Sequence, residues 1–229
     1  MLELHIANKN YSSWSLRPWV LMKALGIPFM EKVHYFSPPG VSSTFGSISP
    51  TAKMPVLVSG TMLVWDTMSI TECLAEDFPH VWPLDKVQRA WARSACAEMH
   101  AGFSALRKEC SMSVGVRVRL HQMSSALKAD IARMESLWAE GLGRFHGPWL
   151  AGGQFTAADA FFGPVAFRFR TYGITLQDRS QAYVDQLLGH PAMMQWEREA
   201  LQETKRDEAH DLEIERAGTI VQDLRVKPA

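Results

Sequence analysis

The hydrophobic pattern of this chain changes its period once, at the stretch PHVWPLD (residues 79–85). Before this stretch, short alternating runs typical of strands are separated by helical runs, whereas after it apolar residues recur only at helical spacing. The two prolines in the stretch favour a break between two folded units. Because the strands are confined to the first third of the chain, we expect a mixed α/β domain over residues 1–80, followed by an all-α domain over residues 86–229.

The expected element order in the first domain is βαβαββα, in which the second helix is at most one turn within an irregular Ser/Pro/Gly-rich stretch. We expect the strands over residues 2–7, 29–36, 56–58 and 62–65, and the main helices over residues 15–25 and 67–78. In the second domain we expect long helices over residues 86–113 and 117–144, and further helices from Thr156, Arg179 and Pro191. The charged tail after Lys205 has no strong apolar stripe, and its structure stays open.

Charge and composition exclude several classes of protein. The 24 basic and 24 acidic residues cancel, whereas a nucleic-acid-binding protein needs a basic excess to neutralise phosphates. No Lys/Arg block suits an anionic membrane surface, and every apolar run is far shorter than the ~20 residues that span a bilayer. The three cysteines are widely spaced and form no metal-binding motif. We therefore expect a cytoplasmic globular protein with no metal, nucleic-acid or membrane partner.

Two serines, Ser12 and Ser13, stand where the first strand gives way to a helix, in the stretch NYSSWSLRPW. A serine there can be an N-cap worth about 1 kcal/mol, and in isolation this interpretation is favoured. A helix N-terminus also stabilises anions. Lowering the pKa of a thiol by about two units needs roughly 2.7 kcal/mol. A hydrogen bond to the charged sulfur supplies about 1.5–3 kcal/mol and the helix end about 0.3–1 kcal/mol, so the two together suffice.

Three further motifs allow both a structural and a functional interpretation. Met54-Pro55, preceded by Lys53, comes directly before a strand, and a cis peptide bond there would turn the Met54 backbone towards an extended peptide. Asp66-Thr67 opens the helix over residues 67–78, either as a cap or as a site for a carboxylate and an amine. Thr156 to Asp159 forms a capping box, which we interpret as structural.

The order of these motifs resembles the soluble glutathione S-transferase family, and within it the serine-type bacterial and zeta-like branch. The similarity covers essentially residues 1–205. It rests on the stretches YSSWSLRPWVLMKALGIPF, SPTAKMPVLVSG, VWDTMSITECLAEDFP, FTAADAFFGPV and HPAMMQWERE. The resemblance implies a thioredoxin-like N-terminal domain that binds glutathione as a co-substrate, and an all-α domain that helps to form the pocket for an electrophile. It also implies a homodimer, with a partner surface on the helix from Thr67 and the long helix after Lys86.

The resemblance also assigns roles to single residues. Ser12 matches the serine that activates the glutathione thiolate, with Ser13 as the second candidate. Met54-Pro55 matches the motif that pairs with the cysteinyl backbone of glutathione. Asp66-Thr67 matches the pair that holds the γ-glutamyl group, and Lys53 can reach the glycyl end.

The electrophile pocket is expected around Trp14, the loop over residues 37–44, and the side chains of Phe103, Leu106 and Phe162. Trp14 stands where the zeta-like pattern has a cysteine, which argues against thiol exchange. Its bulky ring at the pocket entrance also argues against a maleylacetoacetate isomerase, because that reaction needs room for a dicarboxylate. Two alternatives to a conjugating transferase stay open. One is that isomerase, and the other is a non-catalytic binding or regulatory module on the same fold.

Overall fold

The N-terminal part of the chain is built on a four-stranded mixed sheet with the strand order β2-β1-β3-β4. The computed structural model describes residues 1–37, 41 and 43–227. Strand β1 runs parallel to β2 and antiparallel to β3, which in turn pairs antiparallel with β4. The elements are β1 (Leu2–Ile6), α1 (Ser13–Ala24), β2 (Phe29–Val33), a 3-10 turn (Thr44–Ser47), β3 (Val56–Ser59), β4 (Met62–Trp65) and α2 (Thr67–Asp77). The predicted thioredoxin-like α/β order is confirmed, and the irregular stretch contributes only the single short turn.

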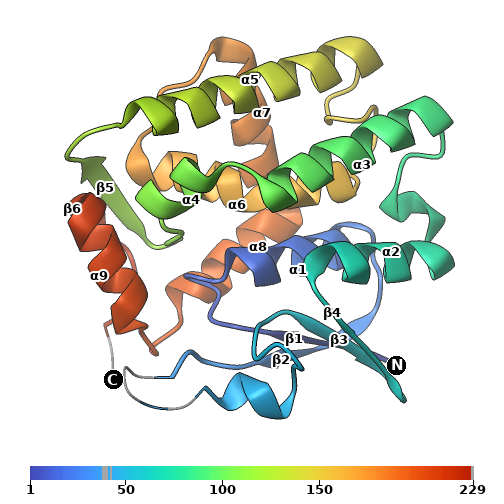
Figure 1. Cartoon of the computed structure of the whole chain (residues 1–229), viewed down its shortest axis with the longest axis horizontal. Coiled ribbons are helices and arrows are strands. Elements are labelled where there is room, and N and C mark those ends of the chain that lie inside the picture. Colours follow the sequence, from blue (N-terminus) through green and yellow to red (C-terminus); the bar gives the residue numbers. More distant parts are fainter. Residues whose placement is uncertain (38–40, 42, 228–229) are drawn as a thin grey trace.

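Helix α1 is the central element of the molecule. Ser12 caps its first turn by accepting a hydrogen bond from the Ser15 N–H. After the last turn, Gly26 adopts a left-handed φ of 67°, and the Ile27 N–H donates to the Met22 carbonyl, which closes the helix. The helix packs against α2 on one side and against α6 and α8 of the C-terminal part on the other (Figure 1). One continuous hydrophobic core therefore joins the two parts of the chain.

The C-terminal part is helical, and α6 is its most buried element. The residues of α6 are buried on almost every face, because it packs against α1, α3 and α7. Within the described residues, none of the helices combines the length and the apolar character needed to cross a membrane. The elements are a 3-10 turn (Pro79–Val81), α3 (Lys86–Ala101), α4 (Ser104–Glu109), β5 (Val116–Leu120), α5 (Ser125–Phe145), α6 (Ala157–Tyr172), α7 (Asp178–Leu188), α8 (Pro191–Leu201), α9 (Glu208–Ala217) and β6 (Gly218–Asp223).

The helices expected over residues 86–113 and 117–144 are wrong at two places. The first ends at Ala101, because Gly102 is extended and Phe103 takes a left-handed φ of 57° before α4 begins. The second begins only at Ser125, because residues 116–120 form β5 and pair antiparallel with β6. The helical domain thus carries a two-stranded sheet, and the charged tail is ordered as α9 and β6 as far as Asp223 (Figure 1).

The capping box at the start of α6 is confirmed. The carboxylate of Asp159 is fully buried, and it accepts hydrogen bonds from the Thr156 N–H at 3.0 Å, the Leu150 N–H at 3.0 Å and the Tyr183 hydroxyl at 3.1 Å. Asp159 therefore fixes the turn before α6 and ties it to α7, which is a structural role.

Candidate functional site

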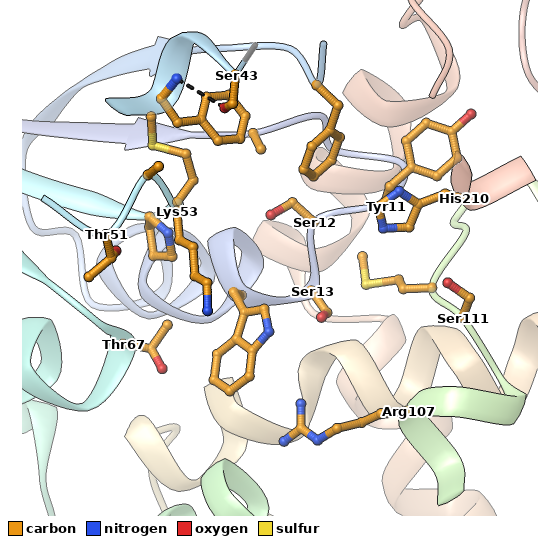
Figure 2. A pocket seen from close by; sticks show the side chains of 18 of the residues that line it. Tyr11, Ser12, Ser13, Ser43, Thr51, Lys53, Thr67, Arg107, Ser111 and His210 are labelled. Atoms are coloured by element: carbon orange, nitrogen blue, oxygen red, sulfur yellow. Dashed lines mark hydrogen bonds between the residues drawn. The ribbon is translucent and has the colours of Figure 1, made fainter. Parts of the chain in front are cut away.

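A cleft of about 770 Å³ opens between the α/β part and the helical part (Figure 2). This volume is typical of a small-molecule site. The α/β part contributes the predicted residues Ser12, Ser13, Trp14, Lys53, Met54, Pro55, Asp66 and Thr67 to the lining. The helical part contributes Arg107, Ser111, Met112, Arg168, His210 and Glu213. Motifs that are separated by more than 50 residues in the sequence therefore meet at one cavity.

The first group of lining residues lies at the N-terminus of α1. Ser12 Oγ donates a hydrogen bond to Ser15 Oγ at 2.7 Å, and Ser15 Oγ also accepts one from the Ala7 N–H at 3.0 Å. The Ser13 hydroxyl has no hydrogen-bond partner among the described residues. In Figure 2 the Ser12 hydroxyl points to the side of the cleft that holds Lys53, whereas the Ser13 hydroxyl points towards Arg107. The two serines thus face different ends of the cleft.

The second group is Lys53-Met54-Pro55, on the approach to β3. The Met54–Pro55 peptide bond is cis. The Met54 side chain packs into a small cluster with Phe45 and Val56, and in the described part of the chain its backbone N–H and C=O form no hydrogen bond. This leaves a backbone donor and acceptor at the cleft wall, the groups that an extended peptide ligand would pair with.

The third group lies at the N-terminus of α2. Asp66 caps this helix by accepting from the Met68 N–H at 2.8 Å, and it does so with a left-handed φ of 71°. A non-glycine residue in this region is strained, and such residues cluster at functional sites. His100 of α3 lies behind the pair, with Nε2 at 3.3 Å from Asp66 Oδ2 and Nδ1 at 3.5 Å from Thr67 Oγ1. Burial lowers the pKa of His100, so the imidazole is neutral at neutral pH.

Trp14 lies in the cleft wall, in contact with two arginines. The guanidinium of Arg17 is 4.2 Å from the centre of the indole ring, and that of Arg107 is 4.9 Å from it. His100 meets the same ring edge-on at 5.1 Å. Cation–π contacts of this kind hold the ring in one place, so Trp14 forms a fixed part of the cleft wall.

Three of the residues expected in the electrophile pocket lie elsewhere. Phe103, Leu106 and Phe162 are buried in the hydrophobic core and are not among the lining residues; the ring of Phe162, for example, packs against Trp138 at 5.7 Å. The sequence shows that these residues are apolar and lie in helical segments, but it does not show which face of each helix meets the cleft. Of the expected loop over residues 37–44, Ser43 lines the cleft, and residues 38–40 and 42 lie outside the described residues.

Comparison with known proteins gives the family. A model of the glutathione S-transferase N-terminal domain matches residues 11–77, and a model of the C-terminal domain matches residues 89–199. The chain belongs to the glutathione S-transferase family. No curated protein matches it. The predicted family is thus confirmed, whereas the serine-type or zeta-like branch is not distinguished by these matches.

Solved structures of other family members share the fold at low sequence identity. A glutathione transferase homologue from Burkholderia GL BGR1, with bound glutathione, is 20% identical, with a TM-score of 0.64 over 87% of this chain and 97% of that chain. The glutathione transferase Omega 3C from Trametes versicolor is 17% identical (TM-score 0.67; 92% and 88% covered). A theta-class enzyme from Xanthomonas axonopodis pv. citri, also with bound glutathione, is 18% identical (TM-score 0.60; 85% and 95% covered). At these sequence identities, the structural similarity shows that this chain shares the fold of these proteins.

Helix α9 contributes His210 and Glu213 to the cleft wall of this family member, which the sequence did not predict. His210 Nδ1 contacts the Asp207 carboxylate, and its ring packs against Phe36 at 5.0 Å and Tyr11 at 5.3 Å. The Tyr11 hydroxyl donates to Asp211 at 3.0 Å, which ties α9 to the start of α1. A weakly patterned tail gave no signal for this contact. Among the described residues, no three His, Cys, Asp or Glu side chains are grouped as a metal site would need.

Proposed function

We propose that the protein is a glutathione transferase that ionises the thiol of glutathione in this cleft and directs it at an electrophile. The observation that carries the proposal is that Ser12, the cis Met54–Pro55 peptide and Asp66-Thr67 all line one cavity, next to the N-termini of α1 and α2. Both helix ends favour anions, and glutathione offers two carboxylates and a thiolate.

Glutathione would lie across the α/β side of the cleft. Thr67 and the first N–H groups of α2 would hold the γ-glutamyl carboxylate, and Asp66, which is exposed, would pair with the α-amine. The unpaired N–H and C=O of Met54 would bind the cysteinyl backbone. The exposed Lys53 would reach the glycyl carboxylate.

This placement brings the glutathione sulfur to the N-terminus of α1. Ser12 would turn its hydroxyl from Ser15 to the sulfur. The backbone N–H of Trp14, which has no hydrogen bond among the described residues, would donate to the sulfur as well. The thiol proton leaves to solvent, and the sulfur then forms a bond to the electrophilic carbon as its leaving group departs. A serine in this role, with no cysteine at the N-terminus of α1, supports the serine-type branch over the thiol-exchanging branches.

The chain also offers a surface for the homodimer that we propose. Large apolar side chains are exposed along β4 and at the start of α3, where a globular monomer normally has few. They are Met62, Leu63, Leu84 and Val87, with exposed fractions between 38% and 66%. Helix α2 lies beside β4 and contacts α3 (Figure 1).

Retention on immobilised glutathione tests the binding step. The folded protein should be retained and then eluted by free glutathione, and Thr67→Val should weaken retention while Thr219→Val, in β6 outside the cleft, should not. A folded protein that passes through the resin would refute the proposal. Turnover with aryl halides, isothiocyanates, hydroperoxides and haloacids tests the enzyme, because binding with no turnover on any of these classes would support a binding module instead.

A further inference from the structure

Three arginines from three different helices meet at the helical end of the cleft. They are Arg17 of α1, Arg107 of α4 and Arg168 of α6. Arg107 and Arg168 line the cavity, and Arg17 lies directly beneath Trp14. Arg17 is 1% exposed and Arg168 is 6% exposed, so both guanidinium groups are removed from water. Figure 2 shows the Arg107 guanidinium on the same side of the cleft as the Ser13 hydroxyl.

None of these three arginines forms an ion pair with a carboxylate in the described part of the chain. Arg107 donates to the carbonyls of Gly102, at 3.0 Å, and Met99, and Arg168 donates to the carbonyl of Cys110. Among the described residues, the Nε and Nη1 atoms of Arg17 have no hydrogen-bond partner. The buried Lys9 is different, because it contacts the carboxylates of both Glu31 and Glu199.

The acidic residues that line the cleft, Asp66 and Glu213, have other partners, and Asp130, whose charge acts on Arg107, accepts a hydrogen bond from the Leu106 N–H at 3.0 Å. Asp66 caps α2 and lies 3.3 Å from the His100 imidazole, and the exposed Glu213 accepts a hydrogen bond from Ser111 at 2.7 Å. Burial, together with the charge of Arg107, lowers the pKa of Arg168 to about 10 and that of Arg17 well below its usual value. A guanidinium stays protonated at neutral pH, so the buried positive charge remains and an anion at this end of the cleft would relieve it.

We infer that the second substrate carries a carboxylate, which Arg107 and Arg168 bind at the helical end of the cleft. This inference rests on the proposed function, because glutathione would fill the opposite end. The planar guanidinium group suits a carboxylate, since it can donate two parallel hydrogen bonds. Trp14 contacts Arg17 and Arg107, so it forms one side of this subsite.

Conjugates that mimic the product test the inference without turnover. S-(4-carboxybenzyl)glutathione and its 3-carboxy isomer are compared by calorimetry with the corresponding uncharged carboxamides. On the wild-type protein, at least one carboxylate should bind about tenfold or more tightly than its carboxamide, because a hydrogen bond to a charged group is lost in the carboxamide. Equal affinity of carboxylate and carboxamide at both ring positions would overturn the inference, and needs no variant.

Variants locate the effect. Arg107→Gln should reduce the preference to within about threefold while leaving the affinity for glutathione itself within about twofold. Arg144→Gln is the matched control, since Arg144 is an exposed residue of α5 whose partner is Glu140, and the preference should survive there. If Arg107→Gln instead weakened glutathione as much as the carboxylate conjugate, Arg107 would bind a carboxylate of glutathione and the inference would fail. A protein that binds no glutathione at all would refute the proposed function itself.

Discussion

Replacing Ser12 by alanine separates the two tasks that this residue would perform. In the structure its hydroxyl accepts a hydrogen bond from the Ser15 N–H at 3.4 Å and donates one to Ser15 Oγ at 2.7 Å. The first contact caps α1, and loss of such a cap typically costs about 1 kcal/mol of stability. Ser15 Oγ keeps its hydrogen bond from the Ala7 N–H. We therefore expect Ser12→Ala to fold, with a free energy of unfolding lower by about 1–2 kcal/mol.

The effect on the bound thiol follows from a competition between two acceptors. To donate to the glutathione sulfur, the Ser12 hydroxyl gives up its neutral hydrogen bond to Ser15, worth about 1 kcal/mol. It gains a bond to a thiolate, worth about 1.5–3 kcal/mol. The net gain of about 0.5–2 kcal/mol corresponds to roughly one pKa unit. Ser12→Ala should thus raise the pKa of the bound thiol by about one unit.

The absorbance of the thiolate, followed against pH with each variant saturated with glutathione, gives this pKa. Ser13→Ala is the matched control, because the Ser13 hydroxyl points towards Arg107 and not towards the glutathione side. Its bound thiol should titrate as in the wild type. An unchanged pKa in Ser12→Ala would refute the assignment, and a shift in Ser13→Ala alone would place the sulfur at Ser13.

Four further predictions concern the scaffold and the proposed dimer surface. Asp159→Ala leaves three buried donors without an acceptor and should lower the free energy of unfolding by about 3 kcal/mol, measured by urea denaturation. Burial raises the pKa of Asp159 to about 6, so the folded state binds this proton more tightly than the unfolded state does. The stability that the bound proton contributes should be complete below about pH 4 and should be lost as the pH rises through about 6. Asp159→Asn should abolish this pH dependence of stability. Lys9→Met leaves the carboxylates of Glu31 and Glu199 without their cation and should cost about 3 kcal/mol, with recovery in variants that also neutralise both acids. Leu84→Asp places a charge on the proposed dimer surface, so sedimentation should show monomers, whereas a wild-type protein that is itself monomeric would contradict the dimer.

The sequence was sufficient for features that depend on neighbours along the chain. The cap at Ser12, the stop at Gly26 and the capping box at Asp159 each depend on a few neighbouring residues, and the order of strands and helices in the α/β part follows from local periodicity. The cleft-lining motifs Met54-Pro55 and Asp66-Thr67 were found because each lies at the start of such an element.

What the sequence missed depends on contacts between distant segments. Residues 116–120 alternate valine with arginine, but their partner strand lies about 100 residues away, and the helical spacing of the apolar residues that follow predicts a helix from Arg117. The approach of Arg17, Arg107 and Arg168 is set by the packing of three helices. In the same way, Phe103 is an apolar residue expected to line the pocket, yet the break in the helix before α4 directs its side chain into the hydrophobic core.

Proton release on glutathione binding tests the central claim most directly. A free thiol with a pKa near 8.5 is about 3% ionised at pH 7, and one bound with a pKa near 6.5 is about 75% ionised, so binding should release about 0.7 proton. Calorimetry in two buffers of different ionisation enthalpy measures this number. We predict that glutathione releases this proton and that S-methylglutathione, which has none to lose, binds without release. Glutathione that fails to bind, or binds without releasing a proton, would contradict the account.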